Sequence, residues 1–186
     1  MNLLVKFKAL LGLEKPYEEA AFSLYGLIVA QARQPYFYRE LKVTDSVEGR
    51  YDMIIIHAFL LFHRLKNENG EARELGQVVF DTMFKDLDQS LREMGVGDMG
   101  VGRRIKKMAA SFYGRLTAYD KALEEEDNGV LEQVIARNVF NKTEPDRRVL
   151  EHLGQYMRNN VEQLKSMSVD SIRTGNLSFV SPETLT

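Results

Sequence analysis

Carboxylate side chains crowd one stretch near the middle of this 186-residue chain, and they are the residue types most able to do chemistry. Four of them fall close together: Asp81, Asp86, Asp88 and Glu93. A di-iron helical bundle binds its metals through such carboxylates together with Glu-x-x-His motifs on facing helices. The chain contains neither Glu-x-x-His nor His-Glu-x-x-His. We therefore expect no metal here, and we interpret the stretch as a solvated acidic helix face or a surface that recognises a partner.

The spacing of charges in this stretch favours an exposed helix. Asp81 stands four residues before Lys85, and Asp88 stands four residues before Arg92. Acid and base at that separation lie on the same face of a helix and form ion pairs there. A helical metal-dependent hydrolase or oxidase that uses these carboxylates is the rival enzyme class, and metal analysis of the purified protein would test it.

A glycine-rich segment follows directly. Residues 95–100 read Gly-Val-Gly-Asp-Met-Gly and match the Gly-x-Gly-x-x-Gly pattern of dinucleotide-binding loops. That pattern binds phosphate when a strand precedes it and a helix follows within a parallel sheet. Here an amphipathic helical pattern precedes it, and no stretch of the chain alternates as a strand does. We therefore expect no cofactor, and we interpret Gly95 as the left-handed end of one helix and Asp98 as the N-cap of the next.

Basic residues follow the glycines at the start of the next predicted helix. Four fall within its first turns, with a fifth further on: Arg103, Arg104, Lys106, Lys107 and Arg115. A helix N-terminus favours acids, so each such charge costs about 0.3–1 kcal/mol of helix stability. These charges either pair with the acids of the preceding helix across the glycine bend or are presented to an anionic partner. The sequence leaves both alternatives open.

The histidines do not suggest catalysis. His57 and His63 are six residues apart, which is about 120° around a helix of ~3.6 residues per turn. Since His57 lies within the apolar run MIIIHAFLLF, we interpret it as a hydrogen-bonded core residue. No motif frames a catalytic nucleophile, so we expect a binding protein with no catalytic residues, and not an enzyme.

Composition narrows the class of protein. The formal net charge of −2 provides no chain-wide attraction for nucleic acid, so we expect no direct DNA binding. The absence of cysteine excludes a disulfide scaffold and a thiolate metal site. A hydrophobic fraction of 44% with 28% charged residues is typical of a soluble globular domain.

Helical periodicity extends over almost the whole chain. It predicts helices over these ranges: 18–32, 50–66, 72–94, 101–123, from 128 onward, and 146–167. Residues 35–49 are predicted as a loop, with Asp45 or Ser46 as the N-cap of the next helix. Thr143 and Asp146 suggest a capping-box variant at the start of the last helix. The predicted fold is an all-α, single-domain bundle of about six to seven helices with a polar C-terminal tail.

We divide the chain into three parts. Residues 1–15 form a predicted N-terminal amphipathic helix, residues 16–167 the helical domain, and residues 168–186 an extended tail. The first part has apolar residues at helical spacing, but it is too short and too charged to span a bilayer. It also lacks the features of a secretory signal or of an Arg-rich transit peptide. We interpret it as a helix docked on the core, with weak membrane-surface contact as the alternative.

Two blocks of the sequence resemble the ubiquinol–cytochrome c chaperone family, the assembly factors for cytochrome b of the bc1 complex. The first, within residues 28–65, contains IVAQARQPYFY and VEGRYDMIIIHAFLLFHRL. The second, residues 81–119, reads DTMFKDLDQSLREMGVGDMGVGRRIKKMAASFYGRLTAY. With the ARN stretch at 136–138, the resemblance covers most of residues 17–140.

The resemblance implies an all-helical chaperone, without catalytic residues or cofactor, that binds newly synthesised cytochrome b. A small partner subunit, the ribosome and peripheral membrane contact are further partners that it leaves open. Because the chain is short and lacks a transit peptide, it is similar to a bacterial member acting in the cytoplasm, at the inner face of the membrane. A peripheral lipid-binding protein that uses the N-terminal helix and the basic residues is the alternative.

The resemblance also points to a client surface. Its first tier comprises Asp81, Asp86, Asp88, Arg92, Glu93, Asp98, Arg103, Lys106, Lys107, Tyr113 and Arg115. Its second tier comprises Gln31, Arg33, Phe37, Tyr38, Arg50 and Asp52. Methionine adapts to irregular apolar surfaces, so we expect methionines around the glycine bend to help cover apolar client segments, with burial in the core as the alternative: Met83, Met94, Met99 and Met108.

Overall fold

The computed structural model describes residues 17–68, 70–141 and 143–183, and the predicted N-terminal helix at 1–15 lies outside the described residues. The described part of the chain contains helices and no strand, which confirms the predicted all-α class. The helices are α2 (Glu18–Ala32), α3 (Pro35–Arg39), α4 (Val47–Leu65), α5 (Gly70–Glu93), α6 (Asp98–Glu124), α7 (Gly129–Val139), α8 (Arg147–Ser166) and α9 (Val169–Arg173).

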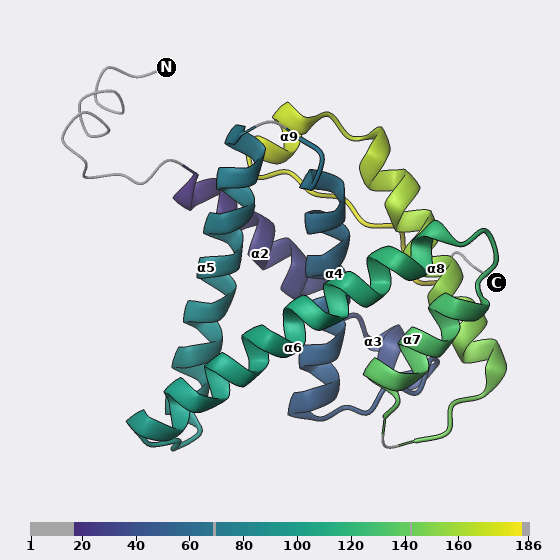
Figure 1. The fold of residues 1–186 in the computed structure, drawn as a ribbon, viewed down its shortest axis with the longest axis horizontal. Helices are drawn as coiled ribbons and strands as arrows, with labels where there is room; N and C mark the ends of the chain where they lie inside the picture. Colours follow the sequence, from purple (N-terminus) through teal and green to yellow (C-terminus); the bar gives the residue numbers. More distant parts are fainter. Residues whose placement is uncertain (1–16, 69, 142, 184–186) are drawn as a thin grey trace.

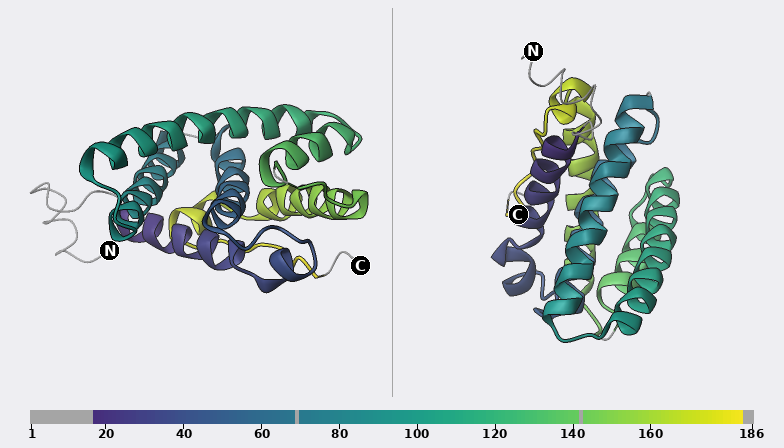
Figure 2. Two further views of the ribbon diagram at one scale, coloured as in Figure 1. Left: turned by 90° about the horizontal axis from the view of Figure 1, so that it is seen from below. Right: turned by 90° about the vertical axis from the view of Figure 1, so that its left-hand side faces the viewer.

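The helices are arranged in layers. Helices α2 and α3 lie along one edge of the molecule, and α6 and α7 lie along the opposite edge (Figure 2). Helices α4, α5 and α8 fill the space between them, and α6 crosses α4 and α5 obliquely (Figure 1). This arrangement places the end of α5 and the start of α6 together at one corner of the molecule, as the tip of a helical hairpin.

Helix α4 is the centre of the hydrophobic core because apolar residues surround it on all sides. Every residue from Asp52 to Leu61 is buried. Ser46, one of the two predicted N-caps, caps the helix. Its Oγ accepts a hydrogen bond from the backbone N–H of Gly49 at 3.1 Å. A Cβ on Gly49 would lie 2.0 Å from the carbonyl oxygen of Thr44. Only glycine therefore allows the loop to approach the helix this closely.

Three local predictions were wrong. The predicted loop over 35–49 contains the short helix α3, because Pro35 occupies a first-turn position where its missing N–H costs nothing. The N-cap of α6 is Gly97, and Asp98 is the first residue of the helix. Asp146 itself caps α8, since its carboxylate accepts from the backbone N–H of Arg148 at 2.9 Å.

The C-terminal segment also differs from the predicted extended tail. Its first residues form α9, and the segment then crosses the core behind α4 as the yellow trace of Figure 1. Leu177 is buried, and the backbone N–H of Val180 donates to Oδ1 of the buried Asn160 at 2.9 Å. The segment therefore belongs to the packed domain.

Candidate functional site

The α5–α6 hairpin turns at Gly95, as the sequence predicts. Gly95 adopts a φ of 81°, in the left-handed region. Its N–H donates to the carbonyl oxygen of Arg92 at 2.9 Å, and the N–H of Val96 donates to that of Leu91 at 3.1 Å. These two bonds form a Schellman motif, which satisfies the last carbonyls of α5 and reverses the chain.

Two methionines project from the tip of this hairpin. The side chain of Met99 is 94% exposed and that of Met94 is 53% exposed. Apolar side chains this exposed gain nothing from the fold, which makes them candidates for contact with another molecule. Met83, by contrast, is buried in the core, and Met108 is partly buried against it.

The acidic residues of the hairpin are occupied by neighbours. Arg92 donates from Nε to Asp88 at 2.6 Å, which confirms the predicted pair four residues apart, and from Nη1 to Asp98. Asp86 accepts from the hydroxyl of Tyr25 at 2.7 Å and so ties α5 to α2. Burial, together with this hydrogen bond, raises the pKa of Tyr25 above its ordinary value, so the hydroxyl stays protonated.

Two further acids of the predicted surface accept hydrogen bonds from glutamines on their own helix. Asp81 accepts from Gln77 at 2.8 Å and Glu93 accepts from Gln89 at 2.9 Å. These bonds lie on the exposed face of α5. Asp81 therefore does not form the predicted pair with Lys85 among the described residues.

The basic residues at the start of α6 have no such neighbours. Arg103, Arg104, Lys106 and Lys107 are exposed, and none of them forms an ion pair with another described residue. The acids that could have balanced them across the bend are held by Arg92, Tyr25 and Gln89. The sequence left open whether these charges pair with the acids of α5 or are presented to an anionic partner, and the structure is consistent with presentation.

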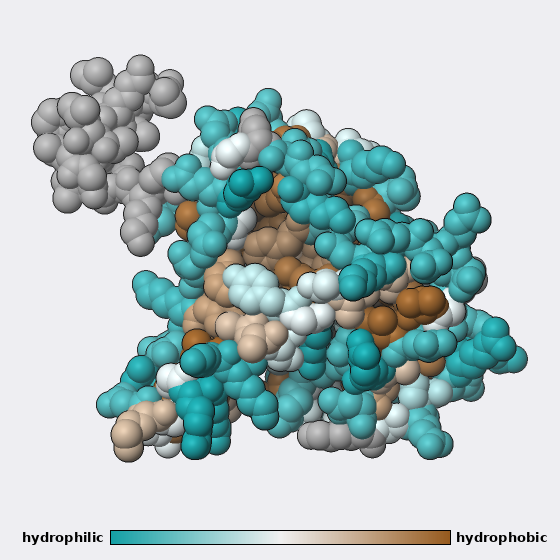
Figure 3. All heavy atoms as spheres, viewed as in Figure 1, coloured by the Kyte–Doolittle hydropathy of each residue, from teal (hydrophilic) through white to brown (hydrophobic). Residues whose placement is uncertain are grey.

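An apolar groove lies between α4, the first half of α5 and the middle of α6, the helix that carries these basic residues. Its cavity has a volume of about 200 Å³. Brown and tan surface gathers in a hollow at this place, with teal surface around it (Figure 3). The groove is lined mainly by Phe62, Leu65, Gly76, Phe80, Phe112 and Leu116, and Tyr113 stands at its edge with 54% exposure.

Aromatic rings form the wall of this groove. Phe80 stacks against Tyr113 with ring centroids 5.5 Å apart and an interplanar angle of 30°. Phe62 meets Phe112 edge-on at 5.7 Å. A Cβ on Gly76 would lie 3.7 Å from the ring of Phe62, so the lack of a side chain at this position leaves the groove open. Lys66, Arg73 and Gln77 provide a polar rim.

Arg115 holds α6 against α4 and does not belong to an open surface. Its Nη1 donates to the buried carboxylate of Asp52, and the two side chains are 15% and 8% exposed. The hydroxyl of Tyr51 adds a bond of 3.4 Å to the carbonyl oxygen of Met108 between the same helices. The prediction that Asp52 and Arg115 contact a client directly conflicts with this burial.

The other second-tier residues lie apart from the hairpin, around α2 and α3. Phe37 is fully buried, so its predicted role on a client surface is wrong. Gln31 donates to the hydroxyl of Tyr156 at 3.0 Å and to the carbonyl oxygen of Val180 at 3.1 Å. Both contacts are internal to the fold, and they attach α2 to α8 and to the C-terminal segment.

Arg33, Tyr38 and Arg50 remain accessible at the surface, Tyr38 only partly. The Tyr38 hydroxyl donates to the carbonyl oxygen of Ala32 at 2.7 Å, and Arg50 donates from Nε to Asp45 at 2.6 Å. The three residues line one surface cavity outside the hairpin.

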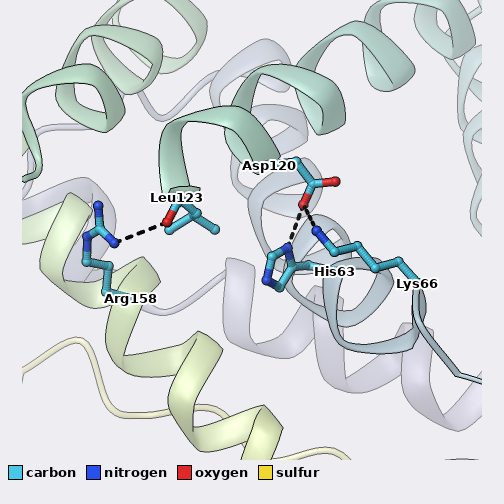
Figure 4. A network of polar contacts seen from close by, with 5 residues as sticks. All are labelled: His63, Lys66, Asp120, Leu123 and Arg158. Carbon is cyan, nitrogen blue, oxygen red and sulfur yellow. Dashed lines mark hydrogen bonds and ion pairs between the residues drawn. The ribbon is translucent and has the colours of Figure 1, made fainter. Parts of the chain in front are cut away.

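Polar contacts also connect α4, α6 and α8 (Figure 4). Asp120 of α6 accepts from Nδ1 of His63 at 2.5 Å and from Nζ of Lys66 at 3.0 Å. Arg158 of α8 donates to the carbonyl oxygen of Leu123 at 3.5 Å. These bonds join α4, α6 and α8. Within the described residues no group of three or more His, Asp or Glu side chains is placed to hold a metal ion.

Sequence reasoning missed the groove. Phe62, Phe80 and Phe112 are far apart in sequence, and each fits the pattern of an ordinary core position. The usable signal was local: Gly76 stands four residues before Phe80 on the same face of a predicted helix. A glycine in an otherwise apolar helix face indicates a gap in packing or a close approach.

The described residues form an all-α domain whose surface carries the apolar groove, the exposed methionines and basic side chains without ion-pair partners among these residues. None of the described helices is both long enough and apolar enough to cross a bilayer. The chain belongs to the ubiquinol–cytochrome c chaperone family, whose model matches residues 39–179, well over half of its length.

Named relatives agree with this assignment. The chain is 26% identical over 161 residues to the human ubiquinol-cytochrome c reductase complex assembly factor 1, covering 86% of this chain and 54% of the human protein. It is also 26% identical over 151 residues to the mitochondrial protein CBP3 of Saccharomyces cerevisiae, covering 79% of this chain and 45% of CBP3. The chain thus spans about half the length of these relatives.

A solved structure is similar over almost the whole chain. The crystal structure of the Cbp3 homolog from Brucella abortus superposes with a TM-score of 0.84 at 36% sequence identity. The match covers 98% of this chain and 99% of the other. The layered all-α arrangement is therefore that of a family member solved by crystallography.

Proposed function

We propose that this chain is an assembly factor for the cytochrome bc1 complex, and that it binds newly synthesised cytochrome b with the groove and the tip of the α5–α6 hairpin. Membership of the ubiquinol–cytochrome c chaperone family supports the assembly role. The observation that carries the site is the open aromatic groove, which is lined in part by α6, the helix whose exposed basic side chains lack ion-pair partners among the described residues.

The chemistry of the groove suits a segment of a membrane protein. Before assembly, the apolar helices of such a client are exposed to water, and covering them removes apolar surface from solvent at about 25 cal/mol per Å². The rings of Phe80 and Tyr113 offer a face for such a segment, and Met99 can adapt its shape to an irregular one. The basic residues of α6 would set orientation and association rate through complementary charge.

The resemblance implies further partners and a place of action, and we include them in the proposal. The chaperone would act in the cytoplasm at the inner membrane face, with the ribosome and a small partner subunit as additional contacts. Peripheral lipid binding is the competing function, favoured by the same exposed basic residues and tested separately below.

The test is site-specific photo-crosslinking during cell-free synthesis of cytochrome b. A photoreactive residue at Tyr113 or Met99 should crosslink to the nascent chain, whereas the same residue at the exposed Glu162 of α8 should not. The double variant Arg103→Glu, Lys107→Glu should lose most of the crosslink and keep its melting temperature. The charge-matched control Arg147→Glu, Lys165→Glu reverses two exposed charges on α8 and should retain it.

Two results would contradict the proposal. Equal crosslinking from Tyr113 and Glu162 would remove the groove from the site. Absence of any crosslink from a folded protein would refute cytochrome b binding, and flotation with anionic vesicles would then decide whether the protein binds membranes.

A further inference from the structure

A second cavity lies at the junction of α2, α3 and α4, at the edge of the molecule opposite α6 (Figure 2). Its volume is about 270 Å³. The residues that line it are Arg33, Pro35, Tyr38, Arg39, Asp45 and Arg50. Three guanidinium groups and one carboxylate give this lining a formal charge of +2, counted as three minus one. The charge of the cavity contrasts with the net charge of −2 on the whole chain.

The single carboxylate balances only one of the three guanidinium groups. Asp45 accepts a hydrogen bond from Nε of Arg50 at 2.6 Å. The Nη groups of Arg50 form no hydrogen bond to another described residue, so a ligand could bind them. Arg33 and Arg39 are exposed and form no ion pair with a described residue. Two guanidinium groups and part of a third are therefore available to an anion.

The fold holds these groups around a rigid floor. The Tyr38 hydroxyl donates to the carbonyl oxygen of Ala32 at 2.7 Å, which fixes α3 against the end of α2. Burial, opposed by the positive charges of Arg50 and Arg33, raises the pKa of Tyr38 to about 12, so this hydroxyl remains a donor.

A fourth cation contacts the backbone of one of the lining residues. Lys42 donates from Nζ to the carbonyl oxygen of Arg39 at 2.6 Å. Its backbone has a φ of 54°, a left-handed conformation that costs a lysine free energy. The loop after α3 therefore holds this ammonium group against the backbone of Arg39, a residue that lines the cavity.

We infer that this arginine-lined cavity binds a phosphate group, carried either by a small soluble phosphorylated molecule or by a phospholipid headgroup. Guanidinium groups bind phosphate oxygens through paired N–H donors. The oxygens of a tetrahedral phosphate point in different directions and can face Arg33, Arg39 and Arg50 at once, whereas the two oxygens of a carboxylate lie in one plane and match a single guanidinium fork. The inference does not depend on the proposed function, because the cavity shares no residue with the groove.

The experiment measures phosphate binding by isothermal titration at constant ionic strength. Inorganic phosphate and glycerol 3-phosphate represent the soluble source, and vesicles of phosphatidic acid in phosphatidylcholine represent the lipid source. Removal of two guanidinium groups in Arg33→Ala, Arg39→Ala should weaken binding by about tenfold or more. The control Arg147→Ala, Lys165→Ala removes the same charge from two exposed positions on α8 that do not line the cavity, and it should leave the affinity unchanged.

The outcomes separate the sources and the alternatives. Binding of soluble phosphates alone supports a soluble ligand. Binding of vesicles that contain phosphatidic acid, with no binding of pure phosphatidylcholine vesicles, supports a headgroup. If the two double variants weakened phosphate binding equally, the binding would depend on the overall charge of the protein and not on the cavity. An equal response to acetate, or no binding of any probe by the folded protein, would refute a phosphate site.

Discussion

His57 shows how one polar residue is accommodated in an apolar core. Its Nδ1 donates to the carbonyl oxygen of Met53 at 2.7 Å, and its Nε2 lies 2.8 Å from the hydroxyl of Tyr156. Because a carbonyl oxygen only accepts, the proton is on Nδ1, and Nε2 accepts from Tyr156. That tyrosine in turn accepts from Gln31. A neutral imidazole satisfies every bond in this chain, and desolvation lowers the pKa of His57 to about 4.

This shift predicts an acid-sensitive core. In the unfolded chain His57 takes up a proton near pH 6.5, whereas in the folded protein it does so near pH 4. The contribution of His57 to the free energy of unfolding is therefore complete above pH 6.5. It declines by about 3 kcal/mol as the pH falls toward 4. Urea denaturation at pH 7 and pH 4.5 measures the loss. The variant His57→Gln should show a smaller difference between the two pH values, although it is less stable at pH 7, and an equal difference would contradict the assignment.

At the scale of the helices, the α5–α6 hairpin depends on one backbone conformation. Gly95 with its φ of 81° lets the last turn of α5 close and turns the chain toward the basic start of α6. A Cβ at Gly95 would touch nothing within 4 Å, so any cost of a side chain there comes from the backbone alone.

Gly95→Ala should therefore destabilise the protein by about 1–2 kcal/mol, the cost of a left-handed conformation for an L-residue. The matched substitution Gly114→Ala, at an exposed position within α6 where a Cβ also meets nothing, should stabilise by about 0.8–1 kcal/mol through helix propensity. Chemical denaturation measures both. A neutral result at Gly95 would mean that the hairpin relaxes freely.

At the scale of the whole molecule, the C-terminal segment completes the core and joins its layers. Phe179 meets the ring of His57 edge-on at 5.1 Å. Gln31 of α2 and Asn160 of α8 both bond to the backbone of Val180. His152 of α8 adds a bond of 2.8 Å to the carbonyl oxygen of Pro182. A segment so connected links the first and last long helices.

Leu177 provides the test of this role. It is 7% exposed, so Leu177→Ala should lower the free energy of unfolding by about 2 kcal/mol. Its exposed neighbour Ser178 serves as the control, and Ser178→Ala should change the free energy of unfolding by less than about 0.5 kcal/mol. If both substitutions were neutral, the segment would not contribute to the stability of the core.

The fold class could be predicted because its signals are local. Apolar spacing predicts α2 to the residue, and Ser46 and Gly95 act as the cap and the bend that their residue types indicate. Predictions failed where a short polar segment is ordered by distant contacts. The C-terminal segment lacks helical periodicity after α9, and its hydrogen bonds to α2 and α8, with the packing of Leu177 and Phe179 on the core, make it part of the domain.

The candidate site divides in the same way. The sequence by itself determined the helices, the bend and the run of basic residues on α6, because periodicity, left-handed glycine and helix-end charge all act between neighbours in the chain. Tertiary structure decided which side chains remain free. It buried Phe37 and Asp52, assembled the groove from three helices, and gathered the arginines of α2, α3 and α4 around one cavity, because burial and pairing depend on contacts between residues far apart in sequence.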